Sequence, residues 1–484
     1  DMDHCFFNQA SIPTSTQNNN QRKVIQYIPH ADDTDDKNGH GTHVCGTVAG
    51  HKSSNGVTGE ENSDNGVAPN VKIAFMDVGE TGEPYLSIPS DAQLLSTGRY
   101  RSYDENAHIH SASWGTSVTD DNRENANGYT QRARNFDNYM YQSPDFLVLV
   151  AAGNDGKFNQ ANSVGTPATA KNILSVGAHI NDVDNMHKIA YFSSRGPTQD
   201  GRTKPDVLAP GDSLTSASAG KNCGLSQKAG TSMATPATAA AAALVRQYFK
   251  EGWFPQGVKG KGSEIKATGA LVKAVLMNGA QWVTDVEGGG TTVEPYDNNQ
   301  GFGRISLTHS LYLAGKTAAL LDVDEGVVED GEDKVYDQTI VTANGCAYPE
   351  FRATLVWTDE PGIAYGRNNL VNDLDLLVTR KRNGTADVDY RPNGRLLKDS
   401  VNNAERVIVD EVEEGDVFEI TVAGANLATD EQSYAIAMTG CLSGVSYTAP
   451  VNPVSNTSDA NDSKTKFIVI VGSVVGTAIL ALLM

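Results

Sequence analysis

A serine stands at the predicted start of an alanine-rich helix, in the segment GTSMATP at 230–236. The pattern predicts a helix from Ser232 to about Phe249, with Pro236 in its first turn. Unpaired amides and the positive end of the helix dipole meet at such a helix start and favour a developing negative charge. Ser232 is therefore a candidate nucleophile, and the alternative is a chance GTS before a core helix.

A histidine is placed in the same way in the segment NGHGTHVCGT at 38–47, where polar residues flanked by glycine lead into a small-residue helix. A serine hydroxyl becomes a good nucleophile at neutral pH when an imidazole within about 2.6–3.2 Å accepts its proton. His40, at the predicted helix entrance, is the candidate for this general base. His43, one turn further on, is predicted to be a packed structural histidine.

An asparagine follows a continuous apolar strand in the segment FLVLVAAGNDG at 146–156. In open parallel α/β sheets, ligands bind beyond the carboxyl ends of the strands. Asn154 is therefore predicted to donate its side-chain amide to the oxyanion of a tetrahedral intermediate. The alternative is an asparagine that only caps a turn.

The segments NGHGTHVCGTVAG, AAGNDG and GTSMATP together resemble the blocks around the catalytic His, the oxyanion Asn and the catalytic Ser of the subtilisin-like serine proteases, peptidase family S8. SSRGPT at 193–198 and KPDVLAPG at 204–211 resemble further blocks, so the likeness covers almost all of residues 1–310. It is nearest to members whose catalytic domain is followed by a β jelly roll. The resemblance implies a serine endopeptidase that needs no cofactor, with protein or peptide substrates and its own pro-segment as partners.

One part of the family pattern is not matched within the chain. The family's orienting aspartate lies in a motif Asp-Thr/Ser-Gly-x-Asp, and Asp1 resembles the second aspartate of that motif. The resemblance therefore puts the catalytic aspartate four residues before Asp1, and a triad without this carboxylate loses about 10⁴ in turnover. Neither Asp1 nor Asp3 is assigned the role, because a chain terminus does not hold a histidine rigidly. The chain as given is expected to be nearly inactive, and the alternative function is an inactive, peptide-binding surface protein with a subtilase fold.

The resemblance also implies where a substrate binds. One segment pairs with the extended substrate backbone by strand addition, and others form the wall and floor of the primary specificity pocket. Gly165 at the floor carries no charge, so the pocket is predicted to accept large apolar side chains. Asp32, Asp33, Asp35 and Asp36 either favour basic residues at neighbouring subsites or form a solvated acidic loop. The predicted substrate-binding residues are Ser113, Trp114, Gly115, Ala152, Gly153 and Gly165.

The elements around these motifs predict an α/β domain over 1–315, with a doubly wound, mostly parallel sheet of the subtilisin-like kind. Apolar strands alternate with helical segments, as in sheets covered by helices on both faces. The predicted strands are 71–78, 107–113, 146–152 and 172–178, and the predicted helices include 91–100 and 135–142.

Beyond this domain an acidic segment at 316–333 is predicted to be a linker. The period then changes to two, which predicts an all-β jelly-roll sandwich over 334–445. Its predicted strands are 351–358, 373–379, 405–412, 417–423 and 433–439. The acidic residues Asp359, Asp373 and Asp375 are candidate calcium ligands, because Ca²⁺ takes oxygen ligands at about 2.3–2.6 Å. The alternative is that they only form turns.

The five cysteines suggest two disulfides and an oxidising compartment. Our hypothesis pairs Cys5 with Cys45 and Cys346 with Cys441, which leaves Cys223 over. Three sequons, at Asn383, Asn456 and Asn461, agree with a secreted or lumenal glycoprotein.

A polar stalk at 446–466 precedes 18 uncharged residues at 467–484. This length reaches the lower limit for a helix that spans a bilayer. The sequence therefore predicts a single-pass membrane protein that contacts lipid through this helix, with its protease domain extracellular or lumenal. A GPI-attachment signal or secretion is the alternative.

Composition excludes some other functions. Among 484 residues, 59 acidic side chains against 38 basic ones give a net charge of -21. Such a charge disfavours nucleic acid and anionic membrane surfaces as partners.

Overall fold

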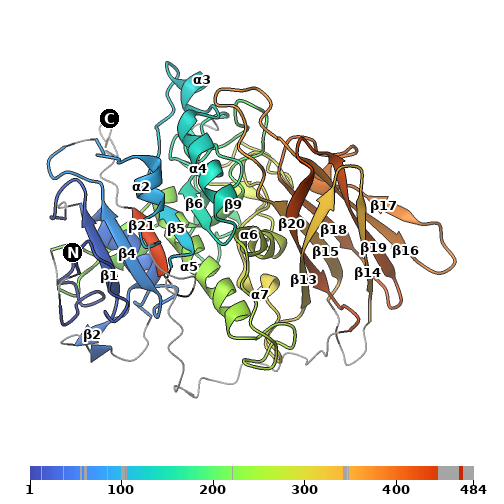
Figure 1. Ribbon diagram of the computed structural model, residues 1–484, viewed down its shortest axis with the longest axis horizontal. Helices are drawn as coiled ribbons and strands as arrows, with labels where there is room; N and C mark the ends of the chain where they lie inside the picture. The colour runs from blue at the N-terminus through green and yellow to red at the C-terminus, as the bar shows by residue number, and fades with distance from the viewer. Residues whose placement is uncertain are drawn as a thin grey trace.

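The computed structural model describes residues 1–444 and 468–472, except residues 12, 36–37, 55–56, 59–62, 84, 100–103, 105, 158–159, 221, 342–345 and 347. It consists of a mostly parallel central sheet with its helices and, beside it, two stacked antiparallel sheets (Figure 1).

The central sheet has the strand order β1-β4-β21-β5-β6-β7-β8-β12, and β9 also pairs with β7. All of these pairs are parallel except that of β7 with β8. The interior strands are buried on both faces, which matches their continuous apolar sequences. Their bounds are β1 Val24–Pro29, β4 Lys72–Asp77, β5 Ile109–Ala112, β6 Leu147–Ala151, β7 Leu174–Ile180, β8 Lys188–Ile189, β9 Val207–Asp212, β12 Asp285–Val286 and β21 Ile468–Gly472.

The helices that carry the predicted catalytic residues pack side by side on this sheet. Helix α1 contacts β4 and β21, and α5 contacts α1, β5, β6 and β7. Helix α4 packs against α2 and β6, and α6 lies between the central sheet and the antiparallel sheets. Among the described residues the helices are α1 His40–Ala49, α2 Asp91–Leu95, α3 Arg123–Ala126, α4 Gln131–Gln142, α5 Thr231–Lys250, α6 Gly269–Asn278 and α7 Leu307–Ser310.

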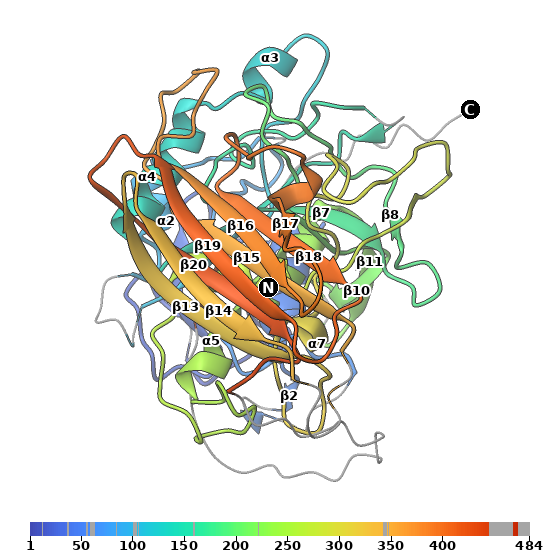
Figure 2. The ribbon, with the colours of Figure 1, turned by 90° about the vertical axis from the view of Figure 1, so that its right-hand side faces the viewer.

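Residues 320–440 form two four-stranded antiparallel sheets that stack on each other (Figure 2). Phe351 and Phe418 join the two sheets through stacked rings whose centroids are 4.2 Å apart. The sheet orders are β13-β20-β15-β18 and β14-β19-β16-β17, and the jelly-roll assignment stays a prediction. The strands are β13 Leu320–Glu329, β14 Asp333–Thr339, β15 Glu350–Trp357, β16 Asp373–Lys381, β17 Val388–Tyr390, β18 Ala404–Asp410, β19 Val417–Asn426 and β20 Glu431–Gly440. Short ribbons elsewhere are β2 Ser53–Ser54 with β3 Val57–Thr58, and β10 Leu214–Ala217 with β11 Leu225–Lys228.

The predicted acidic linker is wrong over its larger part, because β13 begins at Leu320 and pairs along its whole length with β20. Leu320, Leu321 and Val328 are buried, whereas most of the acidic residues between them face solvent or bind polar side chains. Asp322, for example, accepts a hydrogen bond from Gln338 at 2.5 Å. This segment forms a strand because it pairs with β20, which is distant in the sequence. Its high content of acidic residues had suggested a linker.

Two arginines of the antiparallel sheets form hydrogen bonds with backbone carbonyls at the C-terminal end of α6. Arg406 donates to the carbonyls of Met277 at 2.6 Å and Ala280 at 3.2 Å, and Arg352 donates to those of Asn278 and Ala280. The last carbonyls of a helix have no partner within it and attract positive charge. The antiparallel sheets therefore pack on the part of the chain that contains the central sheet and its helices, through buried, charge-assisted hydrogen bonds.

The segment predicted to cross a membrane contributes a strand instead. Residues 468–472 form β21 inside the central sheet, and the rest of 467–484 lies outside the described residues. Isoleucine and valine favour strands, and a run without polar residues suits an interior parallel strand. Among the described residues, no helix is long and apolar enough to cross a bilayer.

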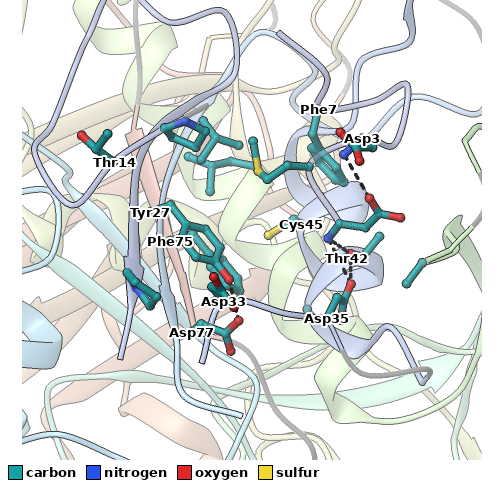
Figure 3. Close-up of a pocket in the computed structure, with 18 of the residues that line it drawn as sticks. Asp3, Phe7, Thr14, Tyr27, Asp33, Asp35, Thr42, Cys45, Phe75 and Asp77 are labelled. Atoms are coloured by element: carbon teal, nitrogen blue, oxygen red, sulfur yellow. Dashed lines mark hydrogen bonds and ion pairs between the residues drawn. The ribbon is translucent and has the colours of Figure 1, made fainter. Parts of the chain in front are cut away.

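The disulfide hypothesis is half wrong. Cys346 pairs with Cys441 as expected, but Cys5 pairs with Cys223 and leaves Cys45 as a free, buried thiol. Cys45 points from α1 toward the β1–β4 side of a cavity (Figure 3). Sequence spacing carries no information on which cysteines meet in space.

We expect one titratable thiol per denatured, non-reduced molecule. The thiol should belong to Cys45, because the other four cysteines are in disulfides. Alkylation in denaturant followed by peptide mass mapping checks this prediction. Modification of Cys223, or a peptide that links Cys5 to Cys45, would contradict the pairing.

Candidate active site

Ser232 lies in the first turn of α5, as the sequence predicts. Its hydroxyl donates to the carbonyl of Ser113 at 3.2 Å, and the Ser113 hydroxyl donates to the carbonyl of Ser232 at 2.9 Å. The two serines thereby hold the start of α5 against the end of β5. The side chain of Ser232 is only partly buried, so it is open to a substrate.

The amide of Asn154 and the backbone N–H of Ser232 border one small space beside Gly230. A Cβ at position 230 would lie 3.4 Å from Asn154 Nδ2 and 3.6 Å from the Ser232 nitrogen. Gly230 has a φ of 151°, which other residues rarely adopt, so glycine both permits the turn and leaves the space empty. Two donors that converge on one point next to a hydroxyl have the geometry of an oxyanion hole.

Asn154 is held in this orientation by its own oxygen. Its Oδ1 accepts hydrogen bonds from the Thr231 N–H at 2.9 Å and from the Thr231 hydroxyl at 3.1 Å. The point beside Gly230 lies 3.4 Å from Nδ2 and 3.7 Å from Oδ1, so the amide nitrogen is the nearer of the two atoms to this space. Sequence reasoning missed Thr231, although its place in the GTS tripeptide could have suggested a role.

His40 is the first residue of α1, as expected, but its imidazole makes no hydrogen bond to another described residue. Its Nδ1 is buried and has no hydrogen-bond partner among the described residues. No hydrogen bond joins His40 to Ser232 within that part of the chain, since Ser232 donates to Ser113. Desolvation, followed by the charges of His43 and Lys228, lowers the pKa of His40 to about 3. His43 has the structural role predicted for it, because its Nε2 lies 3.1 Å from the carbonyls of Leu214 and Ser226.

The segments predicted to bind substrate lie side by side. The Thr116 N–H donates to the Thr166 carbonyl at 2.9 Å, and the Gly165 N–H donates to the Ala152 carbonyl at 3.3 Å. A Cβ at Gly165 would lie 1.9 Å from the Thr116 oxygen, so only glycine permits this close approach. The segments 113–116, 152–154 and 165–166 thus meet next to Ser232.

The profile of the "Subtilase family" of peptidases S8 matches residues 1–303, which is more than half of the chain. This chain belongs to the subtilase family. It is 34% identical over 47% of its length to subtilisin Savinase of Lederbergia lenta, covering 70% of that protein. It is 29% identical over 91% of its length to the serine protease/ABC transporter B family protein tagB of Dictyostelium discoideum. The chain spans 29% of the length of the Dictyostelium protein.

Among solved structures, the prenylagaramide maturation protease PagA is 21% identical and covers 60% of this chain and 84% of its own, with a TM-score of 0.40. The family assignment rests on the profile and on the sequence relatives. Subtilases are serine peptidases.

The side chain of Trp114 lies in the protein interior, although Trp114 stands between Ser113 and Gly115 in the segment predicted to bind substrate. Its indole is buried against the Phe136 ring at 6.2 Å and lies under the Arg132 guanidinium at 5.4 Å. Only its backbone is therefore positioned for substrate. Asp155, which the sequence did not single out, accepts from the Val118 N–H at 2.8 Å and ties the loop after Gly115 to Asn154.

The structure does not bring Asp359, Asp373 and Asp375 together as calcium ligands. Asp359 is fully buried and forms an ion pair with Lys171. Its carboxylate also accepts hydrogen bonds from the backbone N–H groups of Val371 and Asn372, each at 2.9 Å. Asp375 pairs with Lys398. In the part of the chain that the structure describes, no group of three His, Cys, Asp or Glu residues could hold a metal ion. The lysine partners account for Asp359 and Asp375. Asp373 has no lysine partner in the described part of the chain, and burial together with the charges of Asp375 and Asp399 raises its pKa to about 7.

A cavity of about 910 Å³ lies between α1 and the β1–β4 pair (Figure 3). Tyr27, Phe75 and Cys45 line its apolar part, and Asp33, Asp35 and Asp77 are among the acidic residues around it. Asp77 ends β4 and accepts a hydrogen bond from the Tyr27 hydroxyl at 2.7 Å. The acidic loop before α1 thus lines this cavity through Asp33 and Asp35.

We expect Asp77→Asn to flatten the pH dependence of stability between about pH 4 and 6. Burial raises the pKa of Asp77 to about 6, against about 3.9 in an unfolded chain. A carboxyl with a raised pKa favours the fold while protonated, so its contribution is present below pH 4 and is lost as pH rises through 6. The loss amounts to roughly 3 kcal/mol, since each pKa unit is worth about 1.4 kcal/mol.

Urea unfolding at a series of pH values measures this effect, with the exposed Asp121→Asn as the matched control. The variant with asparagine at 77 should gain stability over the unmodified protein as pH increases, and the control should not. A difference between the Asp77 variant and the unmodified protein that is constant from pH 4 to 7 would contradict the burial argument.

Proposed function

We propose that this subtilase is a serine endopeptidase in which Ser232, His40 and Asn154 carry the reaction. The observation that supports it most strongly is the space at Gly230, bordered by the Asn154 amide and by the N–H of Ser232, the residue that carries the proposed nucleophile. An oxyanion formed by attack of this hydroxyl would receive two hydrogen bonds without rearrangement of the backbone.

In the proposed reaction, the Ser232 oxygen bonds to the peptide carbonyl carbon while His40 takes the hydroxyl proton. The carbonyl oxygen becomes an oxyanion between the Asn154 amide and the Ser232 N–H. His40 then gives its proton to the leaving amine as the C–N bond breaks, which leaves an acyl-enzyme on Ser232. A water molecule repeats the attack, with His40 again as base, and releases the acid.

His40 needs a carboxylate that none of the described residues supplies. Its buried, unpartnered Nδ1 supports this requirement, because the base works only when a carboxylate fixes its tautomer and stabilises the imidazolium. We assign this role to the aspartate of the motif expected four residues before Asp1. The free energy lost without it corresponds to about 10⁴ in turnover.

The substrate is proposed to bind as an extended strand along Ser113–Gly115. This segment directly continues β5, and its backbone lies beside Ser232. The uncharged segments 152–154 and 165–166 favour a large apolar side chain before the scissile bond. A pro-segment of the same protein would bind in the same manner.

Two disulfides support an oxidising compartment for this part of the protein. The name of the Dictyostelium relative joins a serine protease to an ABC transporter, which favours a site of action at a membrane. An extracellular or lumenal protease domain remains part of the proposal.

The second candidate function is an inactive, peptide-binding subtilase. The observations that favour it are the Nδ1 of His40, which has no partner among the described residues, and the hydrogen bond that the Ser232 hydroxyl donates to Ser113 rather than to His40. Such a protein would still bind an extended peptide along Ser113–Gly115 but would not hydrolyse it.

A fluorophosphonate probe distinguishes the two functions. The chain extended by its preceding residues is treated with the probe, and the modified peptide is identified by mass spectrometry, with heat-denatured protein as control. Modification at Ser232 in the native sample alone supports the enzyme. A folded protein that binds peptides and is not modified at Ser232 supports the binder.

A further inference from the structure

One loop of the antiparallel sheets reaches the segment that precedes α4. This loop, residues 358–372, connects β15 to β16. Its Gly362 N–H donates to the Tyr129 hydroxyl at 3.3 Å, and its Tyr365 N–H donates to the Tyr129 carbonyl at 2.6 Å. Arg134 of α4 donates in return to the Gly362 carbonyl at 3.0 Å. The loop is therefore bound to Tyr129 through both the backbone and the side chain of this residue.

The hydroxyl of Tyr129 connects two parts of the chain inside the protein. Tyr129 is fully buried, and its hydroxyl accepts from Gly362 and donates to the Asp137 carboxylate at 2.7 Å. Burial, followed by the charge of Asp137, raises the pKa of Tyr129, so the phenol keeps the proton that it donates. The Arg202 guanidinium lies 5.6 Å from the centre of the Tyr129 ring. Phenylalanine at this position would keep the ring packing and lose only the hydrogen bonds.

The residues on either side of Tyr129 hold the segment 164–169, which contains Gly165 at the floor of the proposed specificity pocket. Four hydrogen bonds join 126–130 to this segment. They connect the Thr166 N–H to the Ala126 carbonyl at 2.8 Å, the Asn127 amide to the Val164 carbonyl at 2.9 Å, the Thr169 hydroxyl to the Gly128 carbonyl at 2.8 Å, and the hydroxyls of Thr130 and Thr166 at 2.6 Å. A displacement of Tyr129 would therefore be passed on to the floor of the pocket.

A second connection leads from the same loop to the same segment. Asn369 of the loop donates to the Asp200 carboxylate at 2.7 Å. Arg202 donates to Asp200 at 2.9 Å and to the Thr169 carbonyl at 2.7 Å. All three side chains that make this connection are buried, so water does not compete for the hydrogen bonds. The loop thus holds the segment 164–169 from two directions.

The floor of the pocket has little room for movement. A Cβ at Gly165 would lie 1.9 Å from the Thr116 oxygen and 3.5 Å from Cγ2 of Val118. In an interior packed this closely, a shift of a few tenths of an ångström alters the space left for a substrate side chain. We propose that the loop 358–372 sets the shape of the specificity pocket and that Tyr129 is the positioning residue through which it acts. This inference rests on the proposed function for the place of the pocket, and it assigns a role in specificity to the antiparallel sheets.

The proposed chemistry is held by other contacts. Asn154 is fixed by Thr231, and the start of α5 is fixed by the bond from the Ser113 hydroxyl to the Ser232 carbonyl. None of these bonds involves Tyr129 or the loop. Loss of the Tyr129 hydroxyl should therefore change which side chain is accepted before the scissile bond and leave the reactivity of Ser232 as it is.

The first experiment tests the connection without any catalytic readout. Hydrogen exchange of the full chain is compared between the unmodified protein and Tyr129→Phe. The Thr166 amide should exchange about tenfold faster in the variant, because a lost hydrogen bond favours local opening by about that factor. Tyr336→Phe is the matched control, since it removes a hydroxyl that donates to Asp324 at 2.9 Å within the antiparallel sheets. Equal exchange of the Thr166 amide in both variants would overturn the inference and leave the proposed function untouched.

The second experiment measures specificity in the chain extended by its preceding residues. Two peptides are compared that differ only before the scissile bond, where one has phenylalanine and the other alanine. Tyr129→Phe should lower the preference in kcat/KM for phenylalanine about tenfold, mainly through KM, because small changes in an apolar pocket are worth about 10–200-fold. The alanine peptide and the rate of fluorophosphonate labelling at Ser232 should be unaffected. An equal loss with both peptides would show a merely structural role for Tyr129 and overturn the inference.

Binding measurements separate this inference from the proposed function. In the Ser232→Ala background, fluorescence anisotropy gives the dissociation constants of the same two peptides without cleavage. Addition of Tyr129→Phe should lower their ratio by the same factor of about ten. This change, in a protein whose Ser232 form cleaves neither peptide, would support the role of the loop and count against the peptidase. An unchanged ratio alongside normal cleavage would overturn the role of the loop and leave the peptidase in place.

Discussion

Alanine in place of Ser232 is expected to lower the turnover number on the order of 10⁶-fold in the protein that carries its orienting carboxylate. The reason is that the triad acts as a unit, so removal of the nucleophile leaves only the oxyanion hole and substrate binding. The fold should be unaffected, because the Ser113 hydroxyl still donates to the backbone carbonyl of residue 232. Cleavage of an extended peptide with a large apolar residue before the scissile bond measures kcat and KM.

The matched comparison is Asn154→Ala, which keeps the nucleophile and removes one oxyanion donor. It should lower kcat by about 10²–10³-fold with little change in KM, because the donor acts on the transition state. Thr231→Val removes the hydroxyl that holds Asn154 at 3.1 Å but keeps the N–H bond at 2.9 Å, so its effect should be smaller. Equal activity of Ser232→Ala and the unmodified enzyme would refute the assignment of the nucleophile. An Asn154 variant that changes KM alone would place this residue in ground-state binding.

Lys171→Met is expected to destabilise the protein by about 3–5 kcal/mol, because it leaves the carboxylate of Asp359 buried without its partner. Both side chains are 0% exposed. Lys171 also donates to the carbonyls of Glu360 and Asn369, each at 2.6 Å, so one ammonium group ties the catalytic part to the antiparallel sheets. Urea unfolding followed by fluorescence, together with limited proteolysis near residues 303–320, measures the loss and shows whether the two parts separate.

The exposed pair Lys381–Glu419 supplies the control. Its side chains are 42% and 35% exposed, so solvent screens the pair and Lys381→Met should cost far less stability than Lys171→Met. The double variant Lys171→Met with Asp359→Asn should recover part of the loss, since no buried charge remains. If Lys171→Met costs no more than Lys381→Met, the ion pair does not hold the two parts together.

The sequence by itself determined the three candidate catalytic segments and most of the elements that carry them. His40, Asn154 and Ser232 each follow a local signal, a glycine before a helix start or the end of an apolar strand, and such signals depend on neighbours in the chain. The predicted helix from Ser232 to Phe249 differs from α5 by one residue at each end. The strands β4, β5, β6 and β7 were expected for the same reason.

The tertiary structure decided what depends on residues distant in the chain. The partner of Cys5 is 218 residues away, and Asp359 faces Lys171 rather than the other carboxylates of its own segment. β13 is a strand because β20 covers its hydrogen-bonding edge, although its sequence has the charge of a linker. Residues 468–472 have the composition of a membrane helix or of an interior strand, and the pairing with β4 and β5 selects the strand. Local propensity restricts what a segment can become, and the groups that cover its backbone and side chains in the fold decide which of those structures it adopts.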